Sequence, residues 1–329
     1  MVSGRCQGRD PRSKCLLRLR LLPPSPAASS APCPHYPSHP MNQSALLLVN
    51  HHARRGKETL DEAIAQLKSL GFDLIEESTE NADRIPDIIR QHADRVKLVI
   101  IGGGDGTLNA ATEGLVDTQL PLGILPLGTA NDLARTLGIP TDLTEACKVI
   151  AQGNSEAIDL GWVNGKYFFN VASLGLSVRI TKQLSKDAKR RWGVFAYAIT
   201  ALKVLMGSVP FSAEVRVNGE SRHVKTVQIA VGNGRYYGGG MTVAEDAAID
   251  DQQLDLYSLE VEHWWQMIPL LPAMRSGTHN SWSWVRAMRG QEIEIHTHRP
   301  HDINTDGEIT ATTPAHFRVI PKAISVLVP

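Results

Sequence analysis

The chain has 329 residues, which is enough for two domains. Lysine plus arginine and aspartate plus glutamate both number 34, so the overall positive charge typical of nucleic-acid-binding proteins is absent. Hydrophobic residues make up 42% of the sequence, as in globular proteins. No apolar run reaches the ~18 residues that span a bilayer, so the composition argues against both a nucleic-acid partner and membrane-spanning helices.

The first forty residues differ in composition from the rest of the chain. They are rich in arginine and proline, contain a single acid, Asp10, and hold three of the four cysteines. We expect residues 1–41 to be a disordered extension, although an Arg-rich, acid-poor segment is also typical of a transit peptide. Met41 is then a candidate natural start. Only Cys147 remains in the folded part, so no intramolecular disulfide is expected and a reducing, cytoplasmic compartment is predicted.

The first half of the chain alternates between strand-like and helix-like patterns. Such βαβα order predicts a parallel sheet covered by helices, with ligands outside the carboxyl ends of the strands. The expected strands are Ala45–Val49, Phe72–Glu76, Val96–Ile101 and Leu122–Leu125. The expected helices are Thr59–Leu70, Ala82–His92, one that opens at Thr107, one from Asn131, and Asp142–Gln152.

The second half is predicted to be mostly antiparallel β structure. Asn164-Gly165 and Asn218-Gly219 are strong hairpin signals between strand-like runs. The expected strands are Ala157–Val163, Lys166–Ser173, Ala213–Val217, Val224–Val231, Leu254–Leu259, Gln291–Thr297 and Phe317–Ile320. This series of short strands with turns between them indicates a β-sandwich.

Two apolar features of the second half can each be interpreted either as a lipid-contacting or interface element or as part of the core. A helix predicted for Arg191–Met206 follows several basic residues, so it either meets anionic lipid or packs in the core behind a solvated basic segment. Four tryptophans, Trp264, Trp265, Trp282 and Trp284, either line an acyl cleft or an interface, or pack in the core.

Two glycine-rich turns each follow a predicted strand and precede a predicted helix. The first is Gly102–Gly106, with four glycines and Asp105, and the second is Gly128, followed by the N-cap candidates Thr129, Asn131 and Asp132. A glycine turn at a helix N-terminus favours phosphate, because the backbone can approach closely and free N–H groups attract negative charge. Neither turn matches the dinucleotide-binding or P-loop pattern.

Together, GGDGT at Gly103–Thr107 and GTANDLAR at Gly128–Arg135 resemble the diacylglycerol kinase catalytic superfamily, which includes sphingosine and ceramide kinases and bacterial lipid kinases. The resemblance extends from about Asn42 to Pro329. It implies a Rossmann-like α/β domain followed by a β-sandwich, with the closing strand at Ile324–Val328 returning to the first domain. The corresponding domain limits are 42–156 with 315–329, and 157–314.

The resemblance also implies that ATP binds on the two glycine motifs. A serine or threonine after the second strand meets the nucleotide in the family, and here both Ser78 and Thr79 are candidates. The remaining expected contacts are Gly103, Gly104, Asp105, Gly106, Thr107, Leu108, Asn109, Thr129, Asn131 and Asp132.

A magnesium turn is implied by the segment Ala248–Leu256, which resembles the family's DDG-type motif. Asp251 matches the ligating aspartate, and the carbonyls of Ala248 and Gln253 complete the backbone contribution. Gln252 stands where glycine is usual. Asp105, Asp132 and Asp159 match acidic positions that orient the water shell of the metal, although Asp159 has a turn role as its alternative.

The DGE motif at Asp306–Glu308 supplies the predicted catalytic carboxylates. We favour Glu308 as the acceptor of the lipid hydroxyl's proton and Asp306 as its structural and electrostatic partner. The expected function is an ATP- and Mg²⁺-dependent lipid kinase that contacts the membrane surface transiently. The alternatives are an NAD kinase-like enzyme, since NAD kinases share GGDGT, and a non-catalytic nucleotide-binding regulator.

Overall fold

The computed structural model describes residues 43–49, 57–78, 81–183, 206–242, 247–278 and 282–329. The predicted extension at 1–41, Thr79, and all but the last residue of the helix predicted at Arg191–Met206 lie outside these ranges. Within them, none of the helices is long and apolar enough to cross a membrane.

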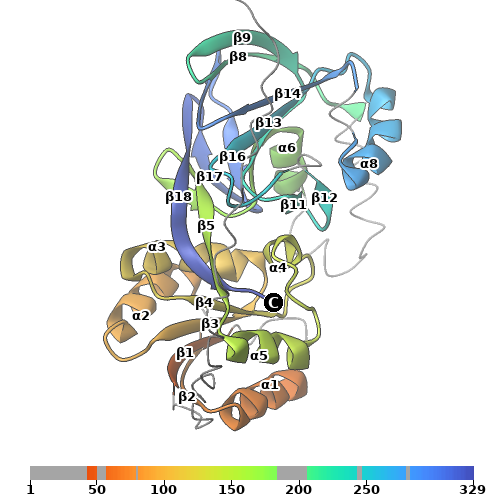
Figure 1. Ribbon diagram of the computed structural model, residues 1–329. Coiled ribbons are helices and arrows are strands. Elements are labelled where there is room, and N and C mark those ends of the chain that lie inside the picture. Colours follow the sequence, from red (N-terminus) through yellow and green to blue (C-terminus); the bar gives the residue numbers. More distant parts are fainter. Residues whose placement is uncertain (1–42, 50–56, 79–80, 184–205, 243–246, 279–281) are drawn as a thin grey trace, which may run out of the picture. The chain divides into compact units, whose positions relative to one another are not determined.

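The first half of the chain forms the predicted parallel sheet with helices against it (Figure 1). Strands pair in the order β2-β1-β3-β4, and helix α1 packs with α5 while α2 packs with α3. The strands are β1 (Gln43–Val49), β2 (Phe72–Ser78), β3 (Leu98–Gly103) and β4 (Leu122–Pro126). The helices are α1 (Lys57–Ser69), η1 (Ala82–Arg84), α2 (Ile85–His92), α3 (Asp105–Thr118), α4 (Asp132–Thr136) and α5 (Leu143–Gln152).

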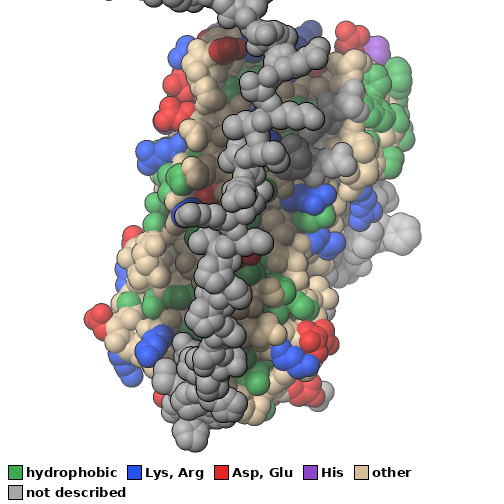
Figure 2. All heavy atoms as spheres, in the orientation of Figure 1, with side chains coloured by type: hydrophobic (Ala, Val, Ile, Leu, Met, Phe, Trp, Pro, Cys, Tyr) green, Lys and Arg blue, Asp and Glu red, His purple; other side chains and the backbone are tan. Residues whose placement is uncertain are grey.

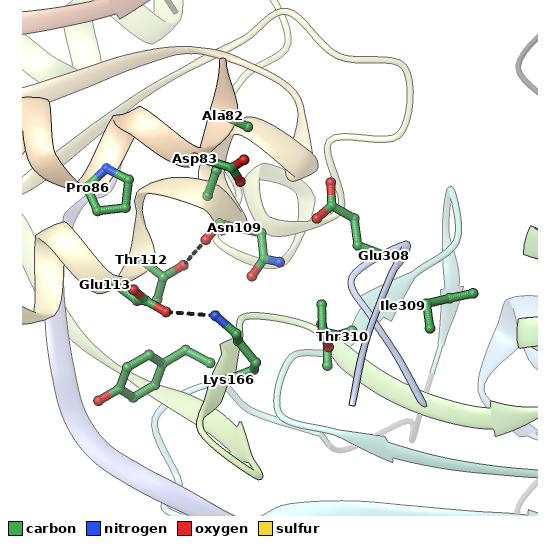
Figure 3. A pocket seen from close by; sticks show the side chains of 13 residues that line it. Ala82, Asp83, Pro86, Asn109, Thr112, Glu113, Lys166, Glu308, Ile309 and Thr310 are labelled. Carbon is green, nitrogen blue, oxygen red and sulfur yellow. Dashed lines mark hydrogen bonds and ion pairs between the residues drawn. The ribbon is translucent and has the colours of Figure 1, made fainter. Parts of the chain in front are cut away.

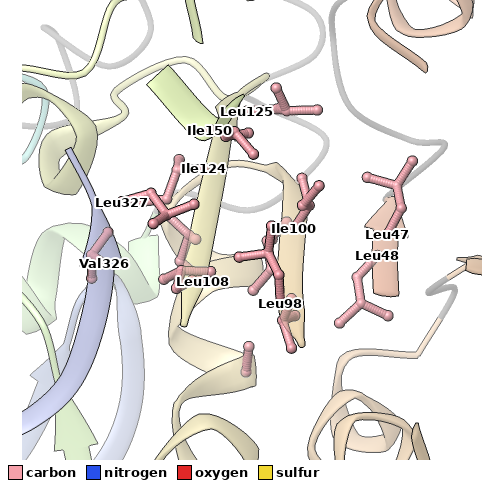
Figure 4. Packing of buried hydrophobic residues seen from close by; sticks show 14 of the residues in the cluster. Leu47, Leu48, Leu98, Ile100, Leu108, Ile124, Leu125, Ile150, Val326 and Leu327 are labelled. Atoms are coloured by element: carbon pink, nitrogen blue, oxygen red, sulfur yellow. The ribbon is translucent and has the colours of Figure 1, made fainter. Parts of the chain in front are cut away.

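The core of this half explains its strand sequences. Every residue of β3 and β4 is buried, as expected of strands covered on both faces. Figure 4 shows Leu98 and Ile100 of β3 beside Ile124 of β4, with Leu108 of α3 in the same cluster. Burial of side chains of this size stabilises the fold by about 1.5–3 kcal/mol each, so the sheet gives the glycine turns a rigid support.

The second half forms the predicted sandwich of two sheets. A six-stranded antiparallel sheet has the order β14-β13-β10-β7-β16-β17, and its buried side chains pack against strands of the larger sheet. Its strands are β7 (Val171–Gly175), β10 (Gln228–Gly232), β13 (Leu254–Leu259), β14 (Val285–Gly290), β16 (Asp302–Thr305) and β17 (Glu308–Thr312). The remaining elements are β5 (Ser155–Val163), β6 (Lys166–Phe168), α6 (Leu176–Gln183), β8 (Phe211–Val217), β9 (Glu220–Thr226), β11 (Tyr236–Tyr237), β12 (Met241–Thr242), η2 (Trp264–Gln266), α8 (Met267–Ser276) and β15 (Glu292–Thr297).

A single long strand, β18 (Ala315–Leu327), joins the two halves. Its last part pairs in parallel with β4, and its first part pairs antiparallel with β15. The main path of the ten-stranded sheet is therefore β2-β1-β3-β4-β18-β15-β8-β9, and the other two strands lie off this path, with β5 on β18 and β6 on β5. Figure 4 shows Val326 and Leu327 in the core of the first half. The expected return of the closing strand is therefore confirmed.

Both Asn-Gly hairpins are confirmed, with Asn164 and Asn218 at φ of 45° and 47°. Three strand predictions need correction. The strand expected at Lys166–Ser173 breaks at Phe169 and Asn170, and the one expected at Val224–Val231 breaks at Val227, where the chain crosses from one sheet to the other. The two strands expected in Phe317–Val328 form one strand with a register shift between Ile320 and Ile324.

Candidate active site

The two glycine turns lie side by side, because β3 and β4 are neighbours in the parallel sheet. The N–H of Leu127 donates to the carbonyl of Gly103 at 3.0 Å. A Cβ atom on Gly128 would lie 2.5 Å from the Cα of Gly104, closer than real Cβ contacts. Packing of one turn on the other therefore requires glycine at these positions, which the sequence alone had not indicated.

Gly106 has no such packing requirement. A Cβ atom there would meet nothing within 4 Å. Helix α3 begins at Asp105, two residues earlier than expected, with Gly104 as its N-cap. The first N–H groups of a helix have no partner within it, so the amides of Asp105 and Gly106 can receive an anion. The amides of Thr107 and Leu108 already donate to Gly104, and the Leu108 side chain lies in the core, so we leave Leu108 out of the site.

Asp105 caps the helix of the other turn. Its Oδ1 accepts a hydrogen bond from the N–H of Leu133, in the first turn of α4, at 3.2 Å. The expected N-cap side chains do not do this: Thr129 is exposed, and Asn131 adopts a left-handed conformation with φ of 49° and donates instead to the Gly128 carbonyl. The two motifs are thus joined through Asp105.

Buried oxygen atoms without a described partner gather around these turns. They are the Oδ1 atoms of Asn109, Asn131 and Asp132. The other oxygen of Asp132 accepts from the N–H of Gly239 at 2.9 Å. Burial raises the pKa of Asp132, and the nearby negative charge of Asp105 acts in the same direction. Buried acceptors are costly unless they are paired, so the site fits a polar ligand with donors or a cation.

Asp306 and Gly307 form the turn between β16 and β17, with φ of 48° and 100°. The carboxylate of Asp306 accepts hydrogen bonds from the N–H groups of Phe169, Asn170 and Val171 at 2.7, 3.1 and 3.0 Å. These bonds explain why the strand expected at Lys166–Ser173 breaks here. Burial raises the pKa of Asp306 to about 7. A pKa in this range would suit a general base. The carboxylate oxygens are already used by three backbone amides, however, so Asp306 is poorly placed to accept a proton from a substrate.

Glu308 faces a hollow of about 450 Å³ between α3, η1 and β17. Figure 3 shows Glu308 and Asn109 on opposite sides of it, with Asp83 beside Ala82 on the same side as Asn109. On the floor, Lys166 pairs with Glu113 at 3.2 Å. The exposed Glu308 can therefore reach a bound hydroxyl, whereas Asp306 holds the loop beneath it.

The predicted metal turn is held by Asp159. The buried carboxylate of Asp159 accepts from the N–H groups of Gln252 and Lys322, both at 2.7 Å. Gln252 has φ of 59°, the left-handed conformation that favours glycine, so the backbone conformation at this position is the one that the usual glycine of the motif adopts readily. Burial raises the pKa of the half-buried Asp251, and the negative charges of Asp255 and Asp159 act in the same direction. A hydrogen bond from the N–H of Gln253 and the positive charge of Arg289 oppose this rise. Among the described residues, no group of three or more His, Cys, Asp or Glu side chains is placed to hold a metal ion, so a site here would depend on Asp251 together with backbone carbonyls.

Replacement of Asp159 by asparagine tests this reading. We expect Asp159→Asn to lower the free energy of unfolding by about 1–3 kcal/mol, because one of the two N–H groups loses its acceptor and the buried side chain gains an amide nitrogen that faces a donor. Urea unfolding measures the change. Asp250→Asn, at an exposed position of the same turn, is the control and is expected to change little. Equal stability of the two variants would contradict the structural role of Asp159.

Of the remaining predicted residues, Ser78 lies at the edge of the sheet that carries the glycine turns, and the residues of the predicted metal turn lie in a different part of the fold. Ser78 pairs with Val49, and Val49 pairs with Gly102, so Ser78 lies two strands from the first glycine turn at the same level. No described contact joins Ala248, Asp251 or Gln253 to the glycine turns. Gly239, whose amide donates to Asp132, was not among the predicted residues. The run of three glycines at Gly238–Gly240 is the feature of the sequence that marks this turn, and all three have positive φ in the structure.

Comparisons with known proteins agree with this architecture. Residues 44–163 match the diacylglycerol kinase catalytic domain, and residues 170–328 match the YegS C-terminal NAD kinase beta sandwich-like domain. The chain is 34% identical over 298 residues to "Probable lipid kinase YegS" from Salmonella dublin, which covers 88% of this chain and 97% of that protein. It is 33% identical over 297 residues to "Probable lipid kinase YegS-like" from Pseudomonas aeruginosa, with coverage of 88% and 96%.

A solved structure from Bacillus anthracis str. Sterne, described as "a putative diacylglycerol kinase", superposes with a TM-score of 0.76 at 25% identity. It covers 87% of this chain and 95% of its own. The identity to the curated relatives over almost their whole length, together with the two matched domains, shows that the chain belongs to the YegS-like lipid kinase family with a diacylglycerol kinase catalytic domain.

Proposed function

We propose that this protein transfers the γ-phosphate of ATP to a hydroxyl group of a lipid such as diacylglycerol, with Mg²⁺ as cofactor. The observation that carries the proposal is the N-terminus of α3, which has open space beside Gly106 and amides without a partner in the helix. The same helix presents Asn109 to the hollow that Glu308 faces. The family and its curated relatives support a kinase that acts on lipids.

Phosphoryl transfer needs positioning and charge neutralisation more than covalent chemistry from the protein. The amides of Asp105 and Gly106 hold the phosphates, and Thr107, Asn109 and Thr129 donate from the helix starts. Ser78 or Thr79 meets the nucleotide from the neighbouring strand end. Asn131 and Asp132 complete the polar wall through their buried oxygens.

Glu308 accepts the proton of the lipid hydroxyl while the new O–P bond forms and the bond between the β- and γ-phosphates breaks, which releases ADP. Asp306 holds the loop at Phe169–Val171 and thereby positions the hairpin that carries Glu308. Mg²⁺, when bound, neutralises carboxylate charge. Asp251, with the carbonyls of Ala248 and Gln253, would hold it.

The deciding experiment incubates the purified chain with ATP, Mg²⁺ and a mixed lipid extract, followed by mass spectrometry of the lipids. A phosphorylated lipid is expected, and its mass identifies the acceptor. Phosphorylation of added NAD instead would indicate the NAD kinase alternative. ATP binding without any phosphorylated product would indicate the regulatory alternative.

Asp105 is expected to act through its charge as well as through its hydrogen bond. Asp105→Asn keeps an oxygen acceptor for the Leu133 N–H but removes the charge. A carboxylate beside phosphates repels them unless a cation intervenes, so we expect lower turnover and a weaker dependence on Mg²⁺ with the melting temperature nearly unchanged. Titration of activity with Mg²⁺ measures this effect. Tighter ATP binding with normal turnover would exclude the metal-related role.

A further inference from the structure

An exposed apolar surface lies far along the chain from the glycine turns, on η2 and α8. We call it the tryptophan surface and define it by Trp264, Trp265, Ile268, Pro269 and Pro272. Trp265 and Ile268 are 55% and 51% exposed. Large apolar side chains at such exposure, grouped on adjacent turns, mark an interaction surface rather than the scattered exposure that every protein has.

The opposite side of the same segment explains why it folds there. Met267, Leu270 and Ala273 are buried, and Met267 and Leu270 pack with Tyr257 and Val285 in the core beneath. A surface helix normally carries polar residues on its outer face. Here residues 264–274, WWQMIPLLPAM, contain no charged residue. Figure 2 shows hydrophobic side chains gathered on the side where Figure 1 places α8, with basic side chains beside them.

We propose that the tryptophan surface is a docking site for an anionic lipid bilayer. Tryptophan is suited to the boundary between headgroups and acyl chains, because its ring is apolar and its N–H is polar. Arg275 ends α8 and is exposed, and Arg235 is exposed on the neighbouring ribbon, stacked on Tyr236 at 5.6 Å. Such cations at the rim of an apolar surface attract anionic headgroups.

The β11–β12 ribbon connects this surface to the candidate active site. Thr242 of β12 donates a hydrogen bond to the backbone oxygen of Arg275 at 3.3 Å. Tyr236 of β11 pairs with Thr242, and the amide of Gly239, in the turn between the two strands, donates to Asp132. A bilayer docked on α8 would therefore lie next to the β11–β12 ribbon, and this ribbon contacts the second glycine motif through Gly239 and Asp132. The choice of a bilayer as the occupant rests on the proposed lipid kinase function.

Flotation with vesicles made of equal parts phosphatidylglycerol and phosphatidylcholine tests the proposal without using kinase activity. We expect the triple variant Trp264→Ser, Trp265→Ser, Ile268→Ser to bind at least ~10-fold more weakly, because three apolar side chains no longer leave water. Leu70→Ser is the matched control: Leu70 is 38% exposed, like Trp264, but follows α1. It is expected to bind as the unmodified protein does.

A second pair of substitutions tests the charge contribution. Arg235→Gln with Arg275→Gln is expected to weaken binding to the mixed vesicles at low salt and to leave binding to pure phosphatidylcholine unchanged. Unaltered melting temperature and unaltered turnover of a water-soluble, short-chain diacylglycerol would show that the fold and the active site are intact. Unchanged vesicle binding by the triple variant would overturn the proposal. A dimeric unmodified protein with a monomeric triple variant would also overturn it, because the tryptophan surface would then join two copies of the chain.

Discussion

Glu308→Gln is expected to lower kcat by about 10²–10⁴-fold, the usual contribution of a general base. Glutamine keeps the shape of the side chain and some hydrogen bonding, but it cannot accept the hydroxyl proton. The KM for ATP is expected to change little, because the proposed nucleotide contacts come from α3, the turn before α4 and the end of β2 rather than from β17. Steady-state kinetics at saturating ATP and varied lipid measure the effect.

Glu113→Gln is the matched control, because Glu113 lines the same hollow but pairs with Lys166 and has no proposed role in catalysis. Asp306→Asn is expected to differ from both, with a clear loss of stability, because an amide nitrogen would face backbone N–H groups. If kcat titrates with a midpoint near 7 and this titration persists in Glu308→Gln, the proton acceptor is Asp306 and our assignment is wrong.

Gly106→Ala is expected to separate ATP binding from stability. Alanine forms helices more readily than glycine, so the free energy of unfolding is expected to stay the same or to increase by up to about 1 kcal/mol. The melting temperature is expected to follow it. The added methyl group occupies the open space in which we place the phosphates. Displacement of the phosphates by this group is expected to reduce kcat/KM for ATP by about 10²-fold.

Gly128→Ala is the contrasting variant, because its Cβ would meet the backbone of Gly104 at 2.5 Å. It is expected to destabilise the fold by about 1–3 kcal/mol, the usual cost of overpacking. Thermal unfolding and ATP titration of the two variants measure both quantities. Normal ATP kinetics in Gly106→Ala would show that the open space at Gly106 is ordinary solvent, and the phosphate site would have to lie elsewhere.

The elements that the sequence predicted correctly depend on local signals. The apolar run Leu98–Ile101, the helical pattern over Asp142–Gln152 and the two Asn-Gly turns each act over a few residues, and the structure has these elements where the patterns indicated. The order of strands and helices then leads to a parallel sheet with both glycine turns at one edge. The resemblance to a known family supplied the pairing of the closing strand with the first half.

The contacts that the sequence could not predict join residues far apart in the chain. Phe169 and Asp306 are separated by 137 residues, and Asp159 and Lys322 by 163. In both cases a carboxylate on one element accepts hydrogen bonds from N–H groups of another part of the chain, where a strand is interrupted or its register shifts. A motif shows that an aspartate is present, but which amides it meets depends on tertiary packing. The amides that Asp159 and Asp306 hold were therefore visible only in three dimensions.

Strand β18 has a consequence for biosynthesis. It lies between β4 and β15 in the large sheet and also pairs with β5, yet it is made after every other described strand. Until β18 has been synthesised, the edge of β4 with which it pairs is open, and unpaired strand edges of this kind attract other chains. The first half of the fold therefore completes its sheet only after the second half has been synthesised, so a nascent chain without β18 exposes this edge to other chains.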